Sequence, residues 1–261
     1  RKITSSDKGL KIAGFFLWFI VVGVTFCVTS LILQLFKFNK IIYFVVNTIL
    51  IYTTLATKCL KDESVLNTEY PMPIAETAST FCETIVKKAA IKEADKITAL
   101  AILESEISDC NQVIVDIYSR FLFEKSLFEA RKESALTVDQ IKKLMLDAQR
   151  EAYGDGLDPE YLHPYMWTWK PHYYYANSNF YNFPYAFGLL FAKGLYAEYL
   201  KKGSEFSSEY ENLLSITGKH NIADITKEVG IDIHNKEFWK SSLRTIEEDI
   251  DKFMELSKEL L

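Results

Sequence analysis

The sixty residues from Ile74 to Glu133 contain neither glycine nor proline. Because glycine and proline interrupt or end helices, their absence over this length favours long helices. Apolar side chains recur there at three- and four-residue steps, the period of an amphipathic helix. They are Ile97, Leu100, Leu103, Ile107, Cys110, Ile114, Ile117 and Phe121. With no alternating strand pattern of convincing length elsewhere, the sequence predicts an all-α fold.

Helix-end signals continue after this stretch. Thr137-x-x-Gln140 is a capping box, which predicts a helix through Ala152 that Gly154 ends. A loop rich in proline and aromatic residues is expected over residues 157–180. The further helices expected are Phe183–Lys202, ended by Gly203, then Glu205–Thr217, Ile222–Val229 and Asn235–Leu260.

The beginning of the chain has a different composition. Residues 1–66 carry a formal charge of +5, whereas residues 67–261 carry −10. The run from Ile12 to Phe36 is uncharged, and about 20 apolar residues suffice to cross a bilayer. A second uncharged run spans residues 41–57. The sequence thus predicts a membrane segment over 1–66, with transmembrane helices 12–36 and 41–57, followed by a helical domain over 67–261.

The charges flanking the two apolar runs predict their orientation. Only Lys37 and Lys40 lie between the runs, while six Lys and Arg residues lie on the other side. The positive-inside rule then puts both ends of the hairpin in the cytoplasm, at the inner membrane. The helical domain is expected to be cytoplasmic, and the absence of a disulfide framework fits a reducing compartment. The alternative is a buried helical hairpin of a soluble protein.

Basic residues of the acidic segment do not cluster with interleaved aromatics, so we expect no nucleic-acid partner. Two acidic residues near its start have a notable spacing instead. Glu76 and Glu83 are seven residues apart, which places both carboxylates on one face of a helix. One carboxylate could bind a metal ion, while the other, in the outer shell, holds a metal ligand in its orientation. Such pairs are also common on solvated helix faces, and that interpretation stays open.

A histidine and five tyrosines fall within the fourteen residues from His172 to Tyr185. This set includes Tyr174 and Tyr181, at the end of a loop that leads into a helix. Histidine and tyrosine both donate hydrogen bonds, as the oxyanion of peptide hydrolysis requires. The alternative is an aromatic core beneath a long loop.

Three segments together resemble a known family: PMPIAETASTFCE, KPHYY and NFYNFPYAFGLLFAKGLYAEY. From about Tyr70 to its end, the chain is similar to the oligoendopeptidase F branch of the thimet-type zinc metallopeptidases. The resemblance implies an enzyme that hydrolyses short peptides with zinc. In that family an HExxH helix supplies two histidine ligands and the general base.

The resemblance also implies roles for individual residues. Glu76 corresponds to the third zinc ligand, and Glu83 to a carboxylate that supports the site. His172 corresponds to the substrate-contacting histidine. The tyrosines that bind peptide and stabilise the tetrahedral intermediate correspond to Tyr185, Tyr181 and Tyr174.

One departure from the family changes the expectation for activity. None of the four histidines belongs to an HExxH motif, and Leu50, Ile51 and Tyr52 occupy the position where that helix is expected. Catalytic zinc needs three protein ligands, so we expect this chain, a truncated or fused peptidase, to be inactive. The alternatives are a membrane-tethered, non-catalytic peptide-binding module and an enzyme completed by HExxH from another chain.

The first residues resemble a different family. Residues 5–65 are similar to part of adenosylcobinamide-phosphate synthase, a membrane enzyme of cobalamin assembly. The segment TTLATKCLKDES carries most of this likeness. Because most of that enzyme has no counterpart here, its ligase activity is not expected.

Overall fold

The computed structural model describes residues 59–60, 63–64, 67 and 71–260. The chain divides into two compact units, Arg1–Asp62 and Glu63–Leu261. The predicted membrane spans, 12–36 and 41–57, lie outside the described residues. Among the residues described, no helix is both long and apolar enough to cross a membrane.

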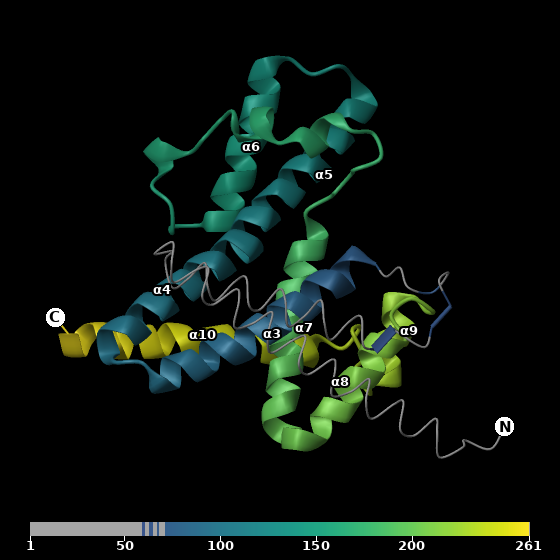
Figure 1. Ribbon diagram of the computed structural model, residues 1–261. Coiled ribbons are helices and arrows are strands. Elements are labelled where there is room, and N and C mark those ends of the chain that lie inside the picture. Colours follow the sequence, from purple (N-terminus) through teal and green to yellow (C-terminus); the bar gives the residue numbers. More distant parts are fainter. Residues whose placement is uncertain (1–58, 61–62, 65–66, 68–70, 261) are drawn as a thin grey trace, which may run out of the picture. The chain divides into compact units, whose positions relative to one another are not determined.

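The second unit consists of helices, with one long connection between α6 and α7, and its described residues contain no strand (Figure 1). This confirms the all-α prediction for this part of the chain. The α-helices are α3 (Met72–Glu93), α4 (Lys96–Asn111), α5 (Ile117–Glu133), α6 (Val138–Tyr153), α7 (Phe183–Lys202), α8 (Phe206–Ser215), α9 (Ile222–Glu228) and α10 (Lys236–Leu260).

The helix ends with clear local signals match the prediction closely. At α6 the Thr137 side chain accepts from the Gln140 N–H at 3.3 Å, and Gln140 Oε1 accepts from the Thr137 N–H at 2.8 Å. This reciprocal pair is the predicted capping box. At the end of α7, Gly203 adopts φ 62°, a left-handed conformation that glycine tolerates at a helix terminus.

Two interruptions within the glycine- and proline-free stretch were not predicted. Asp95 starts α4, because its side chain accepts a hydrogen bond from the Thr98 N–H at 2.9 Å. Between α4 and α5, Gln112–Asp116 forms one turn of π-helix. The extra residue in such a turn shifts which side chains face inward, and π turns often occur at functional sites.

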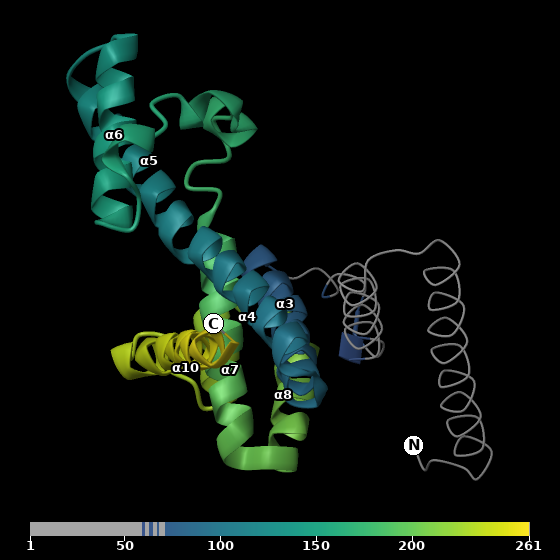
Figure 2. The ribbon, with the colours of Figure 1, turned by 90° about the vertical axis from the view of Figure 1, so that its left-hand side faces the viewer.

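Helix α7 lies at the centre of the packing, between α3 and α10 (Figure 2). Two glycines allow this close approach. A Cβ at Gly188 would lie 2.6 Å from the Cβ of Glu76 on α3, and one at Gly194 would lie 2.8 Å from Ser242 Oγ on α10. Larger residues at either position would push the neighbouring helix away.

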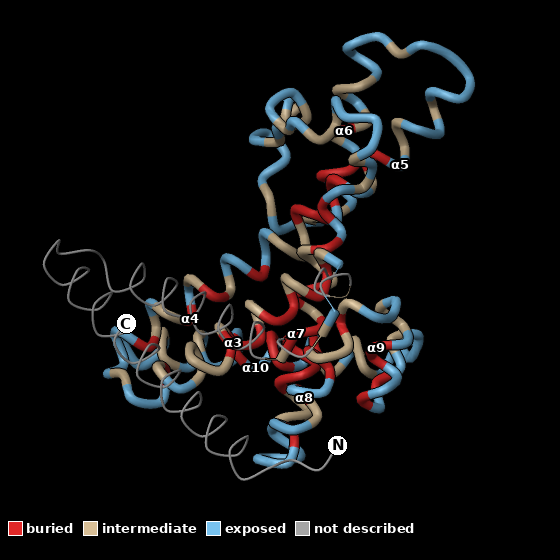
Figure 3. The backbone as a smooth tube through the Cα atoms, turned by 45° about the vertical axis from the view of Figure 1, so that its right-hand side comes forward, coloured by how far each residue is buried: buried red, intermediate tan, exposed pale blue. Residues whose placement is uncertain are grey.

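Many residues along α3 and α7 are buried (Figure 3). The buried residues include charged groups as well as apolar ones. Lys193 of α7 and Glu106 of α4 are 1% and 6% exposed and form an ion pair. Lys87 of α3 joins Glu106 at 2.5 Å. The apolar face predicted from the sequence points inward only in part. Leu103, Cys110 and Ile117 are buried, but Ile97 at its start is 70% exposed.

The α5–α6 hairpin carries the aromatic loop. Phe123 of α5 and Met145 of α6 form a buried cluster, against which Met166, Trp167 and Tyr173 pack. Gln149 of α6 also binds the loop, donating to the His163 carbonyl and accepting from its N–H, both at 2.9 Å. The loop expected over 157–180 thus contains three short 3₁₀ turns, at Pro159–Tyr161, Met166–Trp169 and Pro171–Tyr174, rather than irregular chain throughout.

Candidate functional site

Glu76 lies in the second turn of α3, where α7 passes closest. The helix begins after Pro71, and proline in a first helical turn is favourable because no N–H is lost there. Burial raises the pKa of the half-buried Glu76 carboxyl. Gly188 of α7 is the residue that admits the Glu76 backbone and Cβ. The α3–α7 contact therefore determines where this carboxylate lies.

Glu83 lies two turns further along α3, and its carboxylate is already engaged. It forms an ion pair with Lys87 at 2.7 Å, and Lys87 also reaches Glu106. Burial raises the pKa of Glu106, but Lys193 and Lys87 outweigh this effect and hold it at about 2. Glu83 is thereby tied to a buried charged cluster that joins α3, α4 and α7.

Three of the sequence-predicted aromatic residues lie together at the start of α7. The rings of His172 and Tyr181 stack with their centroids 5.7 Å apart. The rings of Tyr181 and Tyr185 lie edge to face at 6.1 Å, and their hydroxyl oxygens are 3.5 Å apart. The structure thus forms a continuous row, His172–Tyr181–Tyr185, which we call the aromatic row.

Glu76 is close enough to the aromatic row to influence it electrically. The pKa of Tyr185 is raised to about 12, first by the hydrogen bond with Tyr181, then by burial, and also by the negative charge of Glu76. Tyr185 therefore keeps its proton at neutral pH and can donate a hydrogen bond. Glu76 packs against Gly188, which lies three residues after Tyr185 on α7, so α3 and the start of α7 meet here although they lie about one hundred residues apart in the sequence.

Tyr174 does not join this row. Its side chain is 61% exposed, and its hydroxyl donates to the Thr168 carbonyl at 3.4 Å within the loop. The neighbouring Tyr173 points inward instead and packs edge to face on Phe123 at 5.4 Å. Of the four catalytic residues suggested by the sequence, three therefore form the aromatic row, with Tyr181 contacting both His172 and Tyr185.

Behind the aromatic row lies a polar network that the sequence did not reveal. Asn182 is within 2.9 Å of His172 Nε2, and its Oδ1 accepts from Arg120 at 3.4 Å. Arg120 forms an ion pair with Asp116, which also accepts a hydrogen bond from Tyr153 at 3.3 Å. The Asp116–Arg120 spacing is visible in the sequence, but it is also typical of exposed helix pairs. Only folding shows that this pair is buried.

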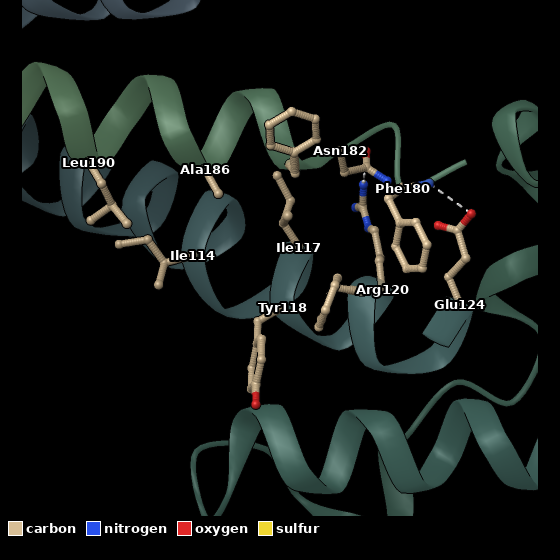
Figure 4. Close-up of a pocket in the computed structure, with 11 residues that line it drawn as sticks. Ile114, Ile117, Tyr118, Arg120, Glu124, Phe180, Asn182, Ala186 and Leu190 are labelled. Atoms are coloured by element: carbon tan, nitrogen blue, oxygen red, sulfur yellow. Dashed lines mark hydrogen bonds between the residues drawn. The ribbon is translucent and has the colours of Figure 1, made fainter. Parts of the chain in front are cut away.

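Arg120 and Asn182 also line a cavity of about 300 Å³ between α5, the π turn and the start of α7 (Figure 4). Its walls are mostly apolar. At one end, Glu124 accepts a hydrogen bond from the Phe180 N–H at 2.9 Å. Phe180 has φ 54°, an unusual conformation for a bulky residue, and it directly precedes Tyr181 and Asn182. The backbone that presents the aromatic row is thus held in a strained turn.

The described residues do not form a complete metal site. Nowhere in the described part of the chain do three His, Cys, Asp or Glu side chains gather in a way that could hold an ion. Glu76 offers one carboxylate, and Glu83 is paired with Lys87. Since catalytic zinc needs three protein ligands, the residues present supply at most one of them.

The relationship to known proteins agrees with this fold. The model for peptidase family M3 matches residues 59–245. A match over most of the chain shows membership: the chain belongs to peptidase family M3.

Within this family, the chain is similar to proteins named oligopeptidase and oligoendopeptidase. It is 25% identical over 189 residues to oligopeptidase PepF of Bacillus subtilis (strain 168), covering 72% of this chain and 28% of that protein. It is 26% identical over 191 residues to the chromosomal oligoendopeptidase F of Lactococcus lactis subsp. cremoris, with coverages of 72% and 31%. The chain thus spans less than a third of the length of these relatives.

A solved structure shares the fold. Oligoendopeptidase-F from Enterococcus faecium superposes with a TM-score of 0.68 at 19% identity, covering 82% of this chain and 39% of that chain. At this identity the likeness establishes the helical arrangement alone. It agrees with the all-helical second unit described above.

Proposed function

We propose that Glu63–Leu261 forms the peptide-contacting part of an oligoendopeptidase F-type site, whose complete form hydrolyses short peptides with zinc. The observation that carries this proposal is the row of Tyr185, Tyr181 and His172, which ends on α7 three residues before Gly188, where Glu76 packs. Three hydrogen-bonding side chains next to a partly buried carboxylate suit recognition of a peptide backbone. The family membership and the oligoendopeptidase relatives support the same substrate class.

Each residue has a role that follows from its chemistry. Tyr185 stays protonated because its pKa is raised, so its hydroxyl can donate to a peptide carbonyl oxygen and to the oxyanion that develops during attack. Tyr181 orients that hydroxyl through the 3.5 Å contact. His172 offers a second donor from the same row. Glu76 would be a metal ligand in the complete site, as the family resemblance implies, and Glu83 fixes α3 through Lys87.

Zinc would supply the activation of water in the complete site, but this chain does not provide the means to hold it. Glu76 is one of the three protein ligands needed, and the sequence contains no HExxH motif. We therefore expect the chain to bind short peptides without hydrolysing them.

Peptide binding is the direct test. A fluorescent, bradykinin-like peptide should bind the full chain, with its affinity measured by fluorescence anisotropy. Tyr185→Phe should weaken binding about tenfold, or about 1.4 kcal/mol, because one hydrogen bond is lost. Tyr175→Phe is the matched control, since Tyr175 is an exposed tyrosine of the same loop outside the aromatic row. Equal affinities in both variants would contradict the proposed role of Tyr185.

Turnover is measured separately. With one equivalent of zinc and a quenched peptide, we expect no increase in fluorescence from the isolated chain. Steady cleavage that Glu76→Gln abolishes would show that a complete site forms, and would overturn the proposal that this chain only binds.

Location is a further part of the proposal. The uncharged runs within residues 12–57 would attach the chain to the cytoplasmic side of the inner membrane and tether the peptide-contacting unit there. Cell fractionation tests this. Recovery of the full chain in the supernatant after membranes are sedimented would contradict the attachment.

A further inference from the structure

The neighbours of His172 determine which nitrogen of its imidazole ring carries the hydrogen. A neutral imidazole carries one hydrogen, on either Nδ1 or Nε2, and the nitrogen without it accepts hydrogen bonds. His172 Nε2 lies 2.9 Å from Asn182 Nδ2. Which nitrogen carries the hydrogen therefore depends on which way the Asn182 amide faces.

The orientation of Asn182 is determined by its other partner. Arg120 Nη1 lies 3.4 Å from Asn182 Oδ1. A guanidinium group only donates hydrogen bonds, so the amide oxygen must face Arg120 (Figure 4). The amide NH₂ then faces His172 and donates to Nε2. Turning the amide over would set its NH₂ against Arg120, donor against donor.

Arg120 is itself held from the other side. It is 9% exposed and forms an ion pair with Asp116, and Asp116 also accepts from the Tyr153 hydroxyl at 3.3 Å. Asn182 is 8% exposed. Because both side chains are largely buried, their protein partners are the main influence on the directions of these hydrogen bonds.

We propose that Arg120, acting through Asn182, holds His172 in the neutral form that carries its hydrogen on Nδ1, so that Nδ1–H is the donor presented to the peptide. Arg120 and Asn182 are thus positioning residues, and His172 is the group that touches substrate. Only the final step, donation to a peptide, rests on the proposed function.

The surrounding charges favour the same neutral state. Burial lowers the pKa of His172, and the cations Arg120 and Lys170 lower it further. Protonation would also place an N–H on Nε2 directly opposite the amide NH₂ of Asn182. The rings of Tyr173 and Tyr181 pack on His172.

His163 provides an internal reference of the opposite kind. Its Nδ1 accepts a hydrogen bond from the Tyr165 N–H at 3.1 Å. In its neutral form the hydrogen must therefore lie on Nε2. The two histidines of this loop are expected to differ in tautomer, and the difference can be observed in one sample.

The experiment is a long-range ¹H–¹⁵N correlation spectrum of the full chain with ¹⁵N-labelled histidine, recorded across pH. We expect neutral His172 to show the Nδ1–H pattern and His163 the Nε2–H pattern. An Nε2–H pattern for His172 in the unmodified chain would overturn the proposal. No metal or peptide is needed, so the result is independent of hydrolysis and of peptide affinity.

Variants test the route through Asn182. Asn182→Asp replaces the donor with a carboxylate that only accepts, so the hydrogen should move to Nε2 and the pKa of His172 should rise. Arg120→Met frees the amide to turn, so the single Nδ1–H pattern should be lost while His163 stays unchanged. Asn177→Leu, at an exposed asparagine of the same loop, is the control and should leave both patterns intact.

The outcomes separate clearly. An unchanged His172 tautomer in a folded Arg120→Met variant, with helicity and the His163 signals as in the parent, would refute the role of Arg120. If the tautomers behave as expected but no short peptide binds, the positioning network stands and the proposed function fails.

Discussion

The two halves of the described unit treat buried polar groups differently. Around α3, α4 and α7, the buried charges are paired: Glu106 contacts both Lys87 and Lys193. In the α5–α6 hairpin and its aromatic loop, Arg120 Nε and the Tyr173 hydroxyl are buried without any hydrogen-bond partner among the described residues.

This difference distinguishes the region around α3, α4 and α7, which stabilises the fold, from the α5–α6 hairpin and its loop, which hold the candidate site. A buried polar group without a partner costs about 1–3 kcal/mol, so a region built only for stability would avoid it. The unpaired atoms belong to Arg120, which bonds Asn182, and to Tyr173, which packs on His172. The strained Phe180 lies in the same region. Such costs concentrate where side-chain geometry matters for function, as the aromatic row requires.

The largest effect is expected from breaking the paired cluster. Glu106→Gln leaves the buried Lys193 without its carboxylate partner and removes one of the carboxylates that contact Lys87, so it should lower the free energy of unfolding by about 3–5 kcal/mol. Urea denaturation measures this. Glu104→Gln, at an exposed glutamate on the same helix, should change stability by less than about 0.5 kcal/mol. Similar losses in both variants would mean that the cluster is not a stabilising element.

The same charged cluster should make the stability of the fold fall at acidic pH. The pKa of Glu106 falls from its usual value of 4.5 to about 2 on folding, so its stabilisation is complete above pH 4.5 and is lost as pH falls toward 2. This contribution is on the order of 3 kcal/mol. Thermal unfolding across this window should show a shallower pH dependence in Glu106→Gln than in the parent. Parallel curves would argue against the depressed pKa.

A smaller effect is expected at the α3–α7 contact. In Gly188→Ala the new methyl would lie 2.6 Å from the Glu76 Cβ, so α3 must shift. Overpacking of this kind costs about 1–3 kcal/mol, partly offset by the helix propensity of alanine. The shift moves Glu76 away from Tyr185, so the apparent pKa of Tyr185 should fall. A spectrophotometric tyrosine titration that is unchanged in Gly188→Ala would contradict this placement of Glu76.

The smallest changes in stability are expected when one buried tyrosine hydroxyl is removed from each half. Tyr173→Phe removes a buried hydroxyl without a partner and should raise stability by about 1 kcal/mol. Tyr210→Phe removes a buried hydroxyl that donates to the Ala78 carbonyl at 3.5 Å, and should lower stability by a similar amount. Urea midpoints measure both variants. Two changes of the same sign would end the distinction between the halves.

The elements that sequence predicted well are those with local causes. The capping box of Thr137 and Gln140 and the left-handed Gly203 act within a few residues, so they can be recognised without knowing the fold. The Asp95 cap was not predicted. It is also a local signal, because the Asp95 side chain accepts from an N–H only three residues further along the chain. The π turn at Gln112–Asp116 has no comparable signature, because packing selects it.

For the candidate site, the sequence indicated His172, Tyr181 and Tyr185 but could not show how their side chains are arranged in space. Their grouping depends on a loop anchored to α6 by Gln149, far from those residues along the chain. The same limit applies to Arg120 and Asn182. An i, i+4 acid–base pair and an asparagine before a helix are ordinary features until burial gives them fixed partners.

The sequence alone determined that residues 71–260 are mostly helical and that the chain is similar to oligoendopeptidases, because helix period, caps and short motifs are encoded in neighbouring residues. Tertiary structure alone decided which charges are buried, which tyrosine leaves the aromatic row, and which way Asn182 faces. These properties arise from contacts between residues far apart in the chain, such as Gly188 with Glu76 and Lys193 with Glu106. Burial and pairing are set only when those segments meet.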